Sequence, residues 1–324
     1  MSLIREASTL KLTGNLVDHP NAAAVKKGVG FAHGTFGELL QGALRGENNH
    51  FLVTLPITRF TKVVFTLDEA LDAISCDPPH KTKSLHFANQ LISHFKRRIG
   101  GHLSIRSDLP EGKGMASSSA DMVATARALE ASLGRRVPVE LILNLLRAIE
   151  PTDGVMFPDF VSFFHRRVAL CRRLGSPSRL RILAIDEGGQ VDTIAYNKRD
   201  HVFTDVEFTE YASLLEQAGT AISINDLGLL GHVATRSAIL NQKRNPKRHL
   251  SEMLEISEET GALGVVVTHS GPCIGLLFPY QHENRNQIER AETRLRHLSN
   301  TVFSLETLGT SPLSRVVEQA ARGA

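Results

Sequence analysis

The pattern of hydrophobic and polar positions predicts an α+β protein in which strands and helices alternate without an internal repeat. Residues 51–66 are dominated by β-branched and aromatic side chains and predict a strand. Residues 102–106 alternate apolar with polar side chains and predict a second strand with one buried face. A turn-rich stretch at 107–114 follows, so the chain is expected to change direction there.

Two helices are predicted next. The first begins at about Ser118, because apolar residues then recur at steps of four, three and four and share one face. These residues are Met122, Ala126, Leu129 and Leu133. Gly134 suits the position after a helix C-terminus. Pro138 suits the first turn of a second helix, whose predicted buried side carries Leu141, Leu145 and Ile149.

The second half is predicted to begin after a Gly/Ser/Pro cluster at 174–178, the candidate domain boundary. Two domains are therefore predicted, 1–175 and 176–324, and a chain of this length can fill two cores. The predicted elements of the second half are a strand at 180–185, helices near 208–218, 226–241 and 249–260, strands at 265–267 and 273–278, a charged helix near 282–297 and a strand near 301–306. Residues 1–25 show no clear period and are predicted to form a loose extension.

Composition narrows the class of protein. The 324 residues are 42% hydrophobic and carry a formal net charge of +3, which argues against disorder. Cys76, Cys171 and Cys273 are far apart and form no CxxC pair, so neither a disulfide framework nor a zinc site is predicted. No segment approaches the roughly 20 apolar residues of a membrane span, and the N-terminus does not look like a signal peptide. A soluble, cytoplasmic protein without a membrane partner is expected.

The strongest local signal for chemistry is LPEGKGMASSSA at 109–120, between a predicted strand and a predicted helix. Glycines let the backbone approach a ligand, and serines at a helix start lie where unpaired N–H groups and the helix dipole favour a phosphate. The alternative is an ordinary turn with serine N-caps, but three consecutive serines favour anion binding. A Walker A loop is excluded because Gly114 follows Lys113, and a Rossmann fingerprint because His33 stands where a glycine is needed.

Three stretches resemble, in order, the motifs of the GHMP kinases, the superfamily of galactokinase, homoserine kinase and mevalonate kinase. Residues 110–120 resemble the second motif, with a proline, spaced glycines, Ser-Ser and Ala. Residues 31–42, FAHGTFGELLQG, resemble the first motif, and residues 264–273, GVVVTHSGPC, resemble the third. The third motif departs from its commonest wording at Thr268-His269, where small residues are frequent. Together the three motifs extend over most of the chain.

The resemblance implies a two-domain GHMP kinase fold, with an N-terminal half like domain 2 of ribosomal protein S5 and a ferredoxin-like C-terminal half. It also implies phosphate transfer from ATP, with Mg²⁺, to the hydroxyl of a small metabolite. The wording of 34–42, 113–118 and 150–153 is most similar to the L-threonine kinase branch associated with cobalamin biosynthesis. There the substrate would be an amino acid and the product O-phospho-L-threonine.

The resemblance assigns the nucleotide phosphates to one loop. Its cofactor-binding residues would be Pro110, Gly112, Lys113, Gly114, Met115, Ala116, Ser117, Ser118 and Ser119. Ser118 matches the family serine that coordinates Mg²⁺. Glu150 would be the second metal ligand, because Mg²⁺ prefers one or two carboxylates together with phosphate and water. The alternative for Glu150 is a solvated acid at a helix end.

Catalysis is assigned to Ser118 and to Asp153, which matches the family aspartate that orients or deprotonates the acceptor hydroxyl. Phosphoryl transfer depends mostly on positioning and charge neutralisation, so such a base helps without being compulsory. Asp153 is equally a turn residue of Thr-Asp-Gly, and Asp159 is the second candidate. The substrate-binding residues would be Glu38, facing an amino group, Gln41, Thr268, Ser270 and Gly271, with His33 a further candidate.

Three alternatives stay open. The kinase could act on another alcohol, such as homoserine or an isoprenoid precursor, or the chain could be a silent relative that binds nucleotide as a sensor. The third is RNA binding through basic clusters at 96–98, 166–167, 172–173 and 243–248. Only 6% of residues are aromatic and none interleaves these clusters, so solvated faces and a flexible loop at 243–248 are preferred, with no nucleic-acid partner. Monomer and homodimer both remain open.

Overall fold

The computed structural model describes residues 27–95, 99–189, 202–281 and 284–309. The strands are β1 (Lys27–Ala43), β2 (His50–Asp68), β3 (Ile74–Asp77), β4 (Gly100–Ser107), β5 (Phe160–Phe164), β6 (Ala169–Gly175), β7 (Leu180–Asp186), β8 (Gly264–Val267), β9 (Cys273–Pro279) and β10 (Val302–Glu306). The helices are α1 (Thr82–His94), α2 (Ser117–Leu133), α3 (Val139–Ile149), α5 (Asp205–Ile224), α6 (Leu227–Asn241), α7 (Leu250–Thr260) and α8 (Arg285–Leu298).

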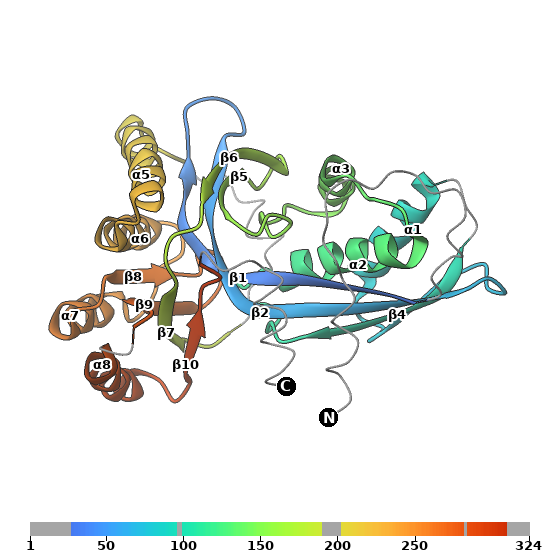
Figure 1. Cartoon of the computed structure of the whole chain (residues 1–324). Coiled ribbons are helices and arrows are strands. Elements are labelled where there is room, and N and C mark those ends of the chain that lie inside the picture. Colours follow the sequence, from blue (N-terminus) through green and yellow to red (C-terminus); the bar gives the residue numbers. More distant parts are fainter. Residues whose placement is uncertain (1–26, 96–98, 190–201, 282–283, 310–324) are drawn as a thin grey trace.

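One continuous sheet connects both halves of the molecule (Figure 1). Its main path runs β10-β7-β9-β8-β1-β2-β4-β3, and β5 joins it by pairing with β2 and carries β6. The long antiparallel hairpin of β1 and β2 forms the middle of this path. Helices α1, α2 and α3 lie over one half of the sheet, and α5 to α8 lie beside the other (Figure 1). The predicted α+β class is confirmed.

The C-terminal half has the strand order of a ferredoxin-like fold. Its chain runs β7, helices, β8, β9, α8, β10, and its strands are ordered β10-β7-β9-β8, which is the βαββαβ arrangement. The proposed boundary between 175 and 176 falls in the connection between β6 and β7. Because the sheet continues past this point through β1 and β8, the boundary separates two halves of one sheet and stays a prediction.

Helix α2 packs directly on β1 because two glycines clear the way for it. Gly28 and Gly30 lie two residues apart and therefore on one face of the strand. A Cβ on Gly28 would lie 2.2 Å from Ala128 O, and one on Gly30 would lie 2.1 Å from Ala124 O. The predicted helix is confirmed: Met122, Ala126 and Leu129 of its apolar stripe are buried, Leu133 is half-buried, and Gly134 ends it in the left-handed conformation.

Two local predictions are corrected. In α3 the fully buried side chains are Ile142 and Leu146, whereas Leu141, Leu145 and Ile149 are only half-buried. The buried face is therefore rotated by about one residue, roughly 100°. Strand β1 was not predicted as such, because its glycines break the apolar pattern. It passes through the first motif with register shifts around Thr35 and Glu38, so that motif is a bulged strand.

The remaining predicted strands and helices are confirmed within a few residues. The predicted extension at 1–25 lies outside the described residues, as does part of the predicted start of α8. Across the described ranges, every helix is too short or too polar to cross a lipid bilayer.

The contact between β1 and α2 generates a stability prediction. Gly30→Ala should lower the free energy of unfolding by about 3 kcal/mol, because the added methyl overlaps helix backbone that cannot move aside without losing core contacts. Chemical denaturation of both proteins measures the difference. The matched control is Gly228→Ala in α6, where the new methyl meets only Asp226 Oδ1 at 3.4 Å. The control should be neutral or stabilising by about 0.5 kcal/mol, and equal effects of both changes would contradict the proposed packing constraint.

Candidate functional site

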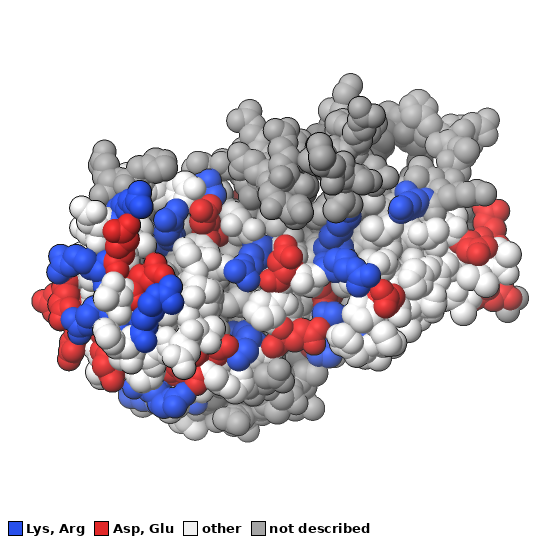
Figure 2. Space-filling model, turned by 90° about the horizontal axis from the view of Figure 1, so that it is seen from below, with Lys and Arg blue, Asp and Glu red and all other residues white. Residues whose placement is uncertain are grey.

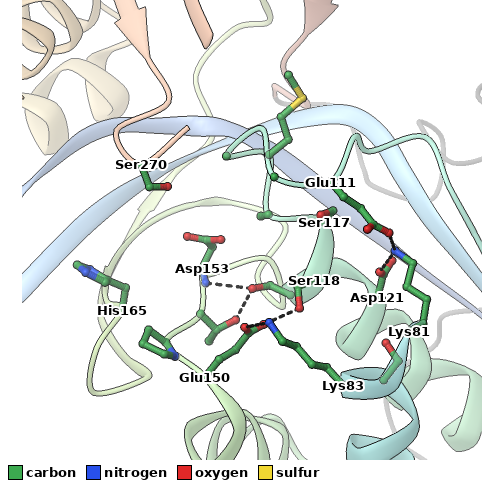
Figure 3. A pocket seen from close by; sticks show the side chains of 18 of the residues that line it. Lys81, Lys83, Glu111, Ser117, Ser118, Asp121, Glu150, Asp153, His165 and Ser270 are labelled. Carbon is green, nitrogen blue, oxygen red and sulfur yellow. Dashed lines mark hydrogen bonds and ion pairs between the residues drawn. The ribbon is translucent and has the colours of Figure 1, made fainter. Parts of the chain in front are cut away.

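A pocket of about 310 Å³ lies where the N-terminal half meets the β8–β9 loop (Figure 3). Its wall combines the loop at 111–119, the start of α1, the turn at 150–153, residues of β1 and Ser270. Most of the predicted site residues line it: Glu38, Gln41, Gly112, Gly114, Met115, Ala116, Ser117, Ser118, Ser119, Glu150, Asp153 and Ser270.

Close backbone contacts bring the three predicted motifs together beside this pocket. The Gly37 N–H donates to Gly114 O at 3.0 Å, and these glycines have φ angles of 52° and 74°. A Cβ on Gly114 would lie 2.8 Å from Thr268 Cβ, and one on Gly271 would lie 2.3 Å from the carbonyl oxygen of Lys113. No side chain fits between the motifs at these points, which explains their glycines.

The N-terminus of α2 faces the pocket and is open to an anion. Ala116 precedes the helix with φ of 58°, and no side chain caps the first turn. Ser117, Ser118 and Ser119 occupy that turn, and all three line the pocket. The first N–H groups of a helix have no partner within it, and the positive end of the dipole favours negative charge there. This arrangement is suited to a phosphate group.

Glu150 lies next to the serines and is held by two hydrogen-bond donors. It is the C-cap of α3 and is 8% exposed, so it is not the solvated helix-end acid of the alternative hypothesis. Ser118 Oγ donates to Glu150 Oε1 at 2.5 Å, and the Lys83 ammonium forms an ion pair with Oε2 (Figure 3). A hydroxyl and a carboxylate oxygen therefore meet at one point, as a magnesium ligand set requires.

Ser119 anchors the turn that carries Asp153. Thr152 Oγ1 donates to Ser119 Oγ at 2.5 Å, and the Asp153 N–H donates to the same oxygen at 3.4 Å. Ser119 and Thr152 are both buried. The turn is thus fixed to the first turn of α2, and Asp153 lies on the side of the pocket nearest Ser270 (Figure 3).

Asp153 lies in an environment that disfavours its negative charge. Removal from water raises the pKa of Asp153 to about 8, and the charges of Glu38 and Glu150 add to this shift. At neutral pH its carboxyl is therefore mostly protonated unless a positive charge is bound nearby. This end of the pocket consequently favours a cationic occupant.

A second charged cluster on the pocket wall consists of Lys81, Glu111 and Asp121. The hydrophobic pattern of the sequence gave no indication of it. Lys81 Nζ lies 2.6 Å from both Asp121 Oδ2 and Glu111 Oε1. Burial works against the ammonium, but these hydrogen bonds outweigh it and raise the pKa of Lys81. Lys81 and Lys83 flank the start of α1, where basic residues oppose the helix dipole. That unfavourable placement is the sequence signal by which this cluster could have been found.

Four predicted residues do not line the pocket. Lys113 turns away from it, because its ammonium pairs with Asp186 at 2.6 Å and donates to Gly189 O at 2.7 Å. Thr268 closes the β8–β9 turn, where its Oγ1 accepts from the Cys273 N–H at 2.8 Å. Gly271 lies behind Gly114, and Pro110 is exposed just before the pocket wall begins.

Two further candidates lie elsewhere. His33 is fully buried, and its ring nitrogens lie 2.9 Å from the carbonyl oxygens of Gly34 and Phe157. It is therefore a core histidine, and burial lowers its pKa. Asp159 pairs with Arg173 at 3.2 Å, away from the pocket wall. Neither residue is in place to contact an acceptor.

The described basic clusters are largely paired with acidic groups. Arg172 pairs with Glu216, and Arg244 pairs with the buried carboxylate of Glu207. The predicted flexible loop at 243–248 is wrong in one respect, because Lys247 is only 4% exposed and donates to Gly271 O at 2.5 Å. Figure 2 shows acidic side chains interleaved with the basic ones on the face it draws. The cluster at 96–98 lies outside the described residues.

Comparisons with known proteins show the family to which the chain is similar. The model of the GHMP kinases N terminal domain matches residues 85–157, and that of the GHMP kinases C terminal domain matches residues 212–298. An L-threonine kinase of Salmonella typhimurium is 28% identical over 272 residues, covering 80% of this chain and 84% of that protein. One of Citrobacter freundii is 27% identical over 273 residues, covering 82% of this chain and 90% of that protein.

Solved structures share the fold at low sequence identity. Homoserine kinase from Cytophaga hutchinsonii has a TM-score of 0.69 at 15% identity, covering 90% of this chain and 98% of that chain. Mevalonate kinase from L. major, in complex with R-mevalonate, has a TM-score of 0.66 at 15% identity, covering 88% and 97%. With both family models matched in order, this chain belongs to the GHMP kinases and is an ATP-dependent small-molecule kinase.

Proposed function

We propose that this kinase transfers the terminal phosphate of ATP to the side-chain hydroxyl of L-threonine, giving O-phospho-L-threonine, as in the branch associated with cobalamin biosynthesis. The two L-threonine kinases support this choice of substrate. The observation that carries the proposal is the polarity of the pocket. The start of α2 favours phosphate, while Glu38 and Asp153 favour the positive charge that an amino acid brings.

The phosphate end is the loop from Gly112 to Ser119. Its glycines leave the backbone accessible, and its serines and first-turn N–H groups can donate to phosphate oxygens. Lys83 is 42% exposed in its side chain and reaches the same region from α1. When a nucleotide binds, the Lys83 ammonium can move from Glu150 to a phosphate oxygen, where it would neutralise part of the phosphate charge.

Ser118 and Glu150 fit Mg²⁺, which takes oxygen ligands and usually completes its shell with phosphate and water. Among the described residues, no group of three or more His, Cys, Asp or Glu side chains could hold a metal ion. The two proposed ligands would therefore share the ion with the nucleotide. Bound there, Mg²⁺ would neutralise charge on the phosphates.

Asp153 is the proposed residue that orients or deprotonates the acceptor hydroxyl. Its turn is fixed to Ser119, next to the proposed phosphate site. The neighbouring charges of Glu38 and Glu150 raise its proton affinity. A bound ammonium or metal ion would lower that affinity and leave an ionised carboxylate beside the hydroxyl. Charge development and proton transfer would then occur in a fixed geometry.

Ser118→Ala tests the phosphate end. Turnover should fall by about 100-fold, because a group that stabilises the transition-state charge is lost. The thermal unfolding midpoint should stay near that of the wild type. Steady-state kinetics with ATP and threonine provides the measurement, and a fully active variant would remove Ser118 from the mechanism.

Asp153→Asn tests the acidic end through stability. Folded Asp153 keeps a proton to about pH 8, whereas the unfolded chain releases it near pH 4. The wild type should therefore lose stability as pH rises between these values. The unfolding midpoint of the variant minus that of the wild type should increase by about 4 °C from pH 5 to pH 8.5. Thermal unfolding at both pH values measures this change. The turnover of the variant should fall by roughly 100-fold.

The matched control for that change is Asp159→Asn, whose carboxyl lies outside the pocket wall. This variant should follow the pH dependence of the wild type. If Asp153→Asn and the wild type keep the same difference at both pH values, the raised pKa of Asp153 is wrong.

A substrate panel tests the acceptor. ATP consumption should be measured with L-threonine, L-serine, L-homoserine and mevalonate. L-threonine should give the highest kcat/KM. Turnover of another member without turnover of threonine would overturn the choice of substrate and leave the kinase assignment intact.

A further inference from the structure

A buried chain of hydrogen bonds lies behind the acidic end of the pocket. His269 Nδ1 lies 2.9 Å from Glu38 Oε2, and the His269 N–H donates to the same oxygen at 3.1 Å. His269 Nε2 lies 2.7 Å from Ser237 Oγ. Ser237 Oγ in turn accepts from the Gln41 N–H at 3.1 Å. Three distant segments therefore meet at one imidazole.

The side chains of Glu38, His269 and Ser237 are shielded from water, but they differ in whether they reach the pocket. Glu38 is 6% exposed, His269 1% and Ser237 0%. Glu38 lines the pocket, whereas His269 and Ser237 do not. His269 can therefore act on a bound molecule only through Glu38, and it belongs to the support behind the pocket wall.

The hydrogen bonds indicate which nitrogen of His269 carries its proton. Ser237 Oγ accepts a hydrogen bond from the Gln41 N–H and can donate its own O–H to Nε2. Nδ1 then carries the ring proton and donates it to the Glu38 carboxylate. Glu38 is consequently oriented by two N–H donors of the same residue.

The backbone of His269 is fixed independently of its ring. The His269 carbonyl accepts from Asn245 Nδ2 at 2.7 Å. Two residues further along the loop, Gly271 O accepts from the buried ammonium of Lys247 at 2.5 Å. The His269 N–H would thus remain beside Glu38 if the ring were changed, and the contribution of the ring can be measured separately.

We propose that His269, supported by Ser237, is a positioning residue that fixes the ionised Glu38 carboxylate for the ammonium group of an amino-acid substrate. This inference deepens the proposed function and depends on it for the amino-acid nature of the acceptor. It accounts for a histidine in the third motif where small residues are frequent. It also identifies α6, through Ser237, as part of the specificity of the site.

The experiment compares His269→Asn with His269→Gln. The amide nitrogen of asparagine lies near the position of Nδ1 and keeps the donor to Glu38. That of glutamine reaches the position of Nε2 and keeps only the contact with Ser237. His269→Gln should raise KM for L-threonine by about 10- to 100-fold, the usual effect of losing a hydrogen bond to a charged group. His269→Asn should stay within about threefold of the wild type, and Ser237→Ala should fall between them.

A substrate that lacks the ammonium group separates positioning from a general structural role. 3-Hydroxybutanoate is threonine without its amino group, so its kcat/KM should be equally low in the wild type and in His269→Gln. KM for ATP should not change in any variant. Equal losses with both acceptors, a raised KM for ATP, or equal behaviour of His269→Asn and His269→Gln would each overturn the inference.

Failure of the inference and failure of the proposed function give different results. If the wild type prefers homoserine over threonine, the substrate proposal fails, and the same comparison is made with homoserine and 4-hydroxybutanoate. The inference stands when only the ammonium-bearing acceptor responds to His269→Gln. If the wild type prefers mevalonate, or turns over no amino acid, the inference is overturned.

Discussion

The site depends on one steric constraint, the contact of three backbone segments with no side chain between them. Gly37 of β1, Gly114 before α2 and Gly271 between β8 and β9 lie so close that a methyl group on any of them would overlap a neighbour. These segments are far apart in the sequence, so the whole fold must form before they meet. In return, their polar groups are held at fixed separations, which is what phosphoryl transfer requires of a protein.

The same rigidity explains why unfavourable electrostatics persist in the pocket. Burial raises the pKa of Asp153, and the charges of Glu38 and Glu150 raise it further. In a flexible site these acids would separate into water. Here Glu150 is held by Ser118 and Lys83, Glu38 by His269, and the Asp153 turn by Ser119. A bound cation would reduce the repulsion among these acids, so their burial makes the binding of positive charge more favourable.

Local features of the site could be predicted from the sequence, and contacts between distant segments could not. The serines at the start of α2 and Glu150 at the end of α3 were predicted, because helix ends have clear residue signals. Lys113 was misplaced because its partner, Asp186, lies in β7. The bulged β1 gave no signal because its glycines break the apolar pattern. The contact between Glu38 and His269 gave none because it depends on how the two halves join.

The junction of the two halves is also where the proposed acceptor site lies. Strands β1 and β8 pair through Glu38 and Val267, and the Glu38 side chain then meets His269, two residues beyond Val267. The backbone of Glu38 thus joins the two halves of the sheet, while its carboxylate faces the pocket. A change in the register of this pair would move Glu38 away from His269 and disturb the contacts of Gly37 with Thr268. The sheet register therefore acts together with the loop contacts at Gly114 and Gly271 to fix the acidic group relative to the serines of α2.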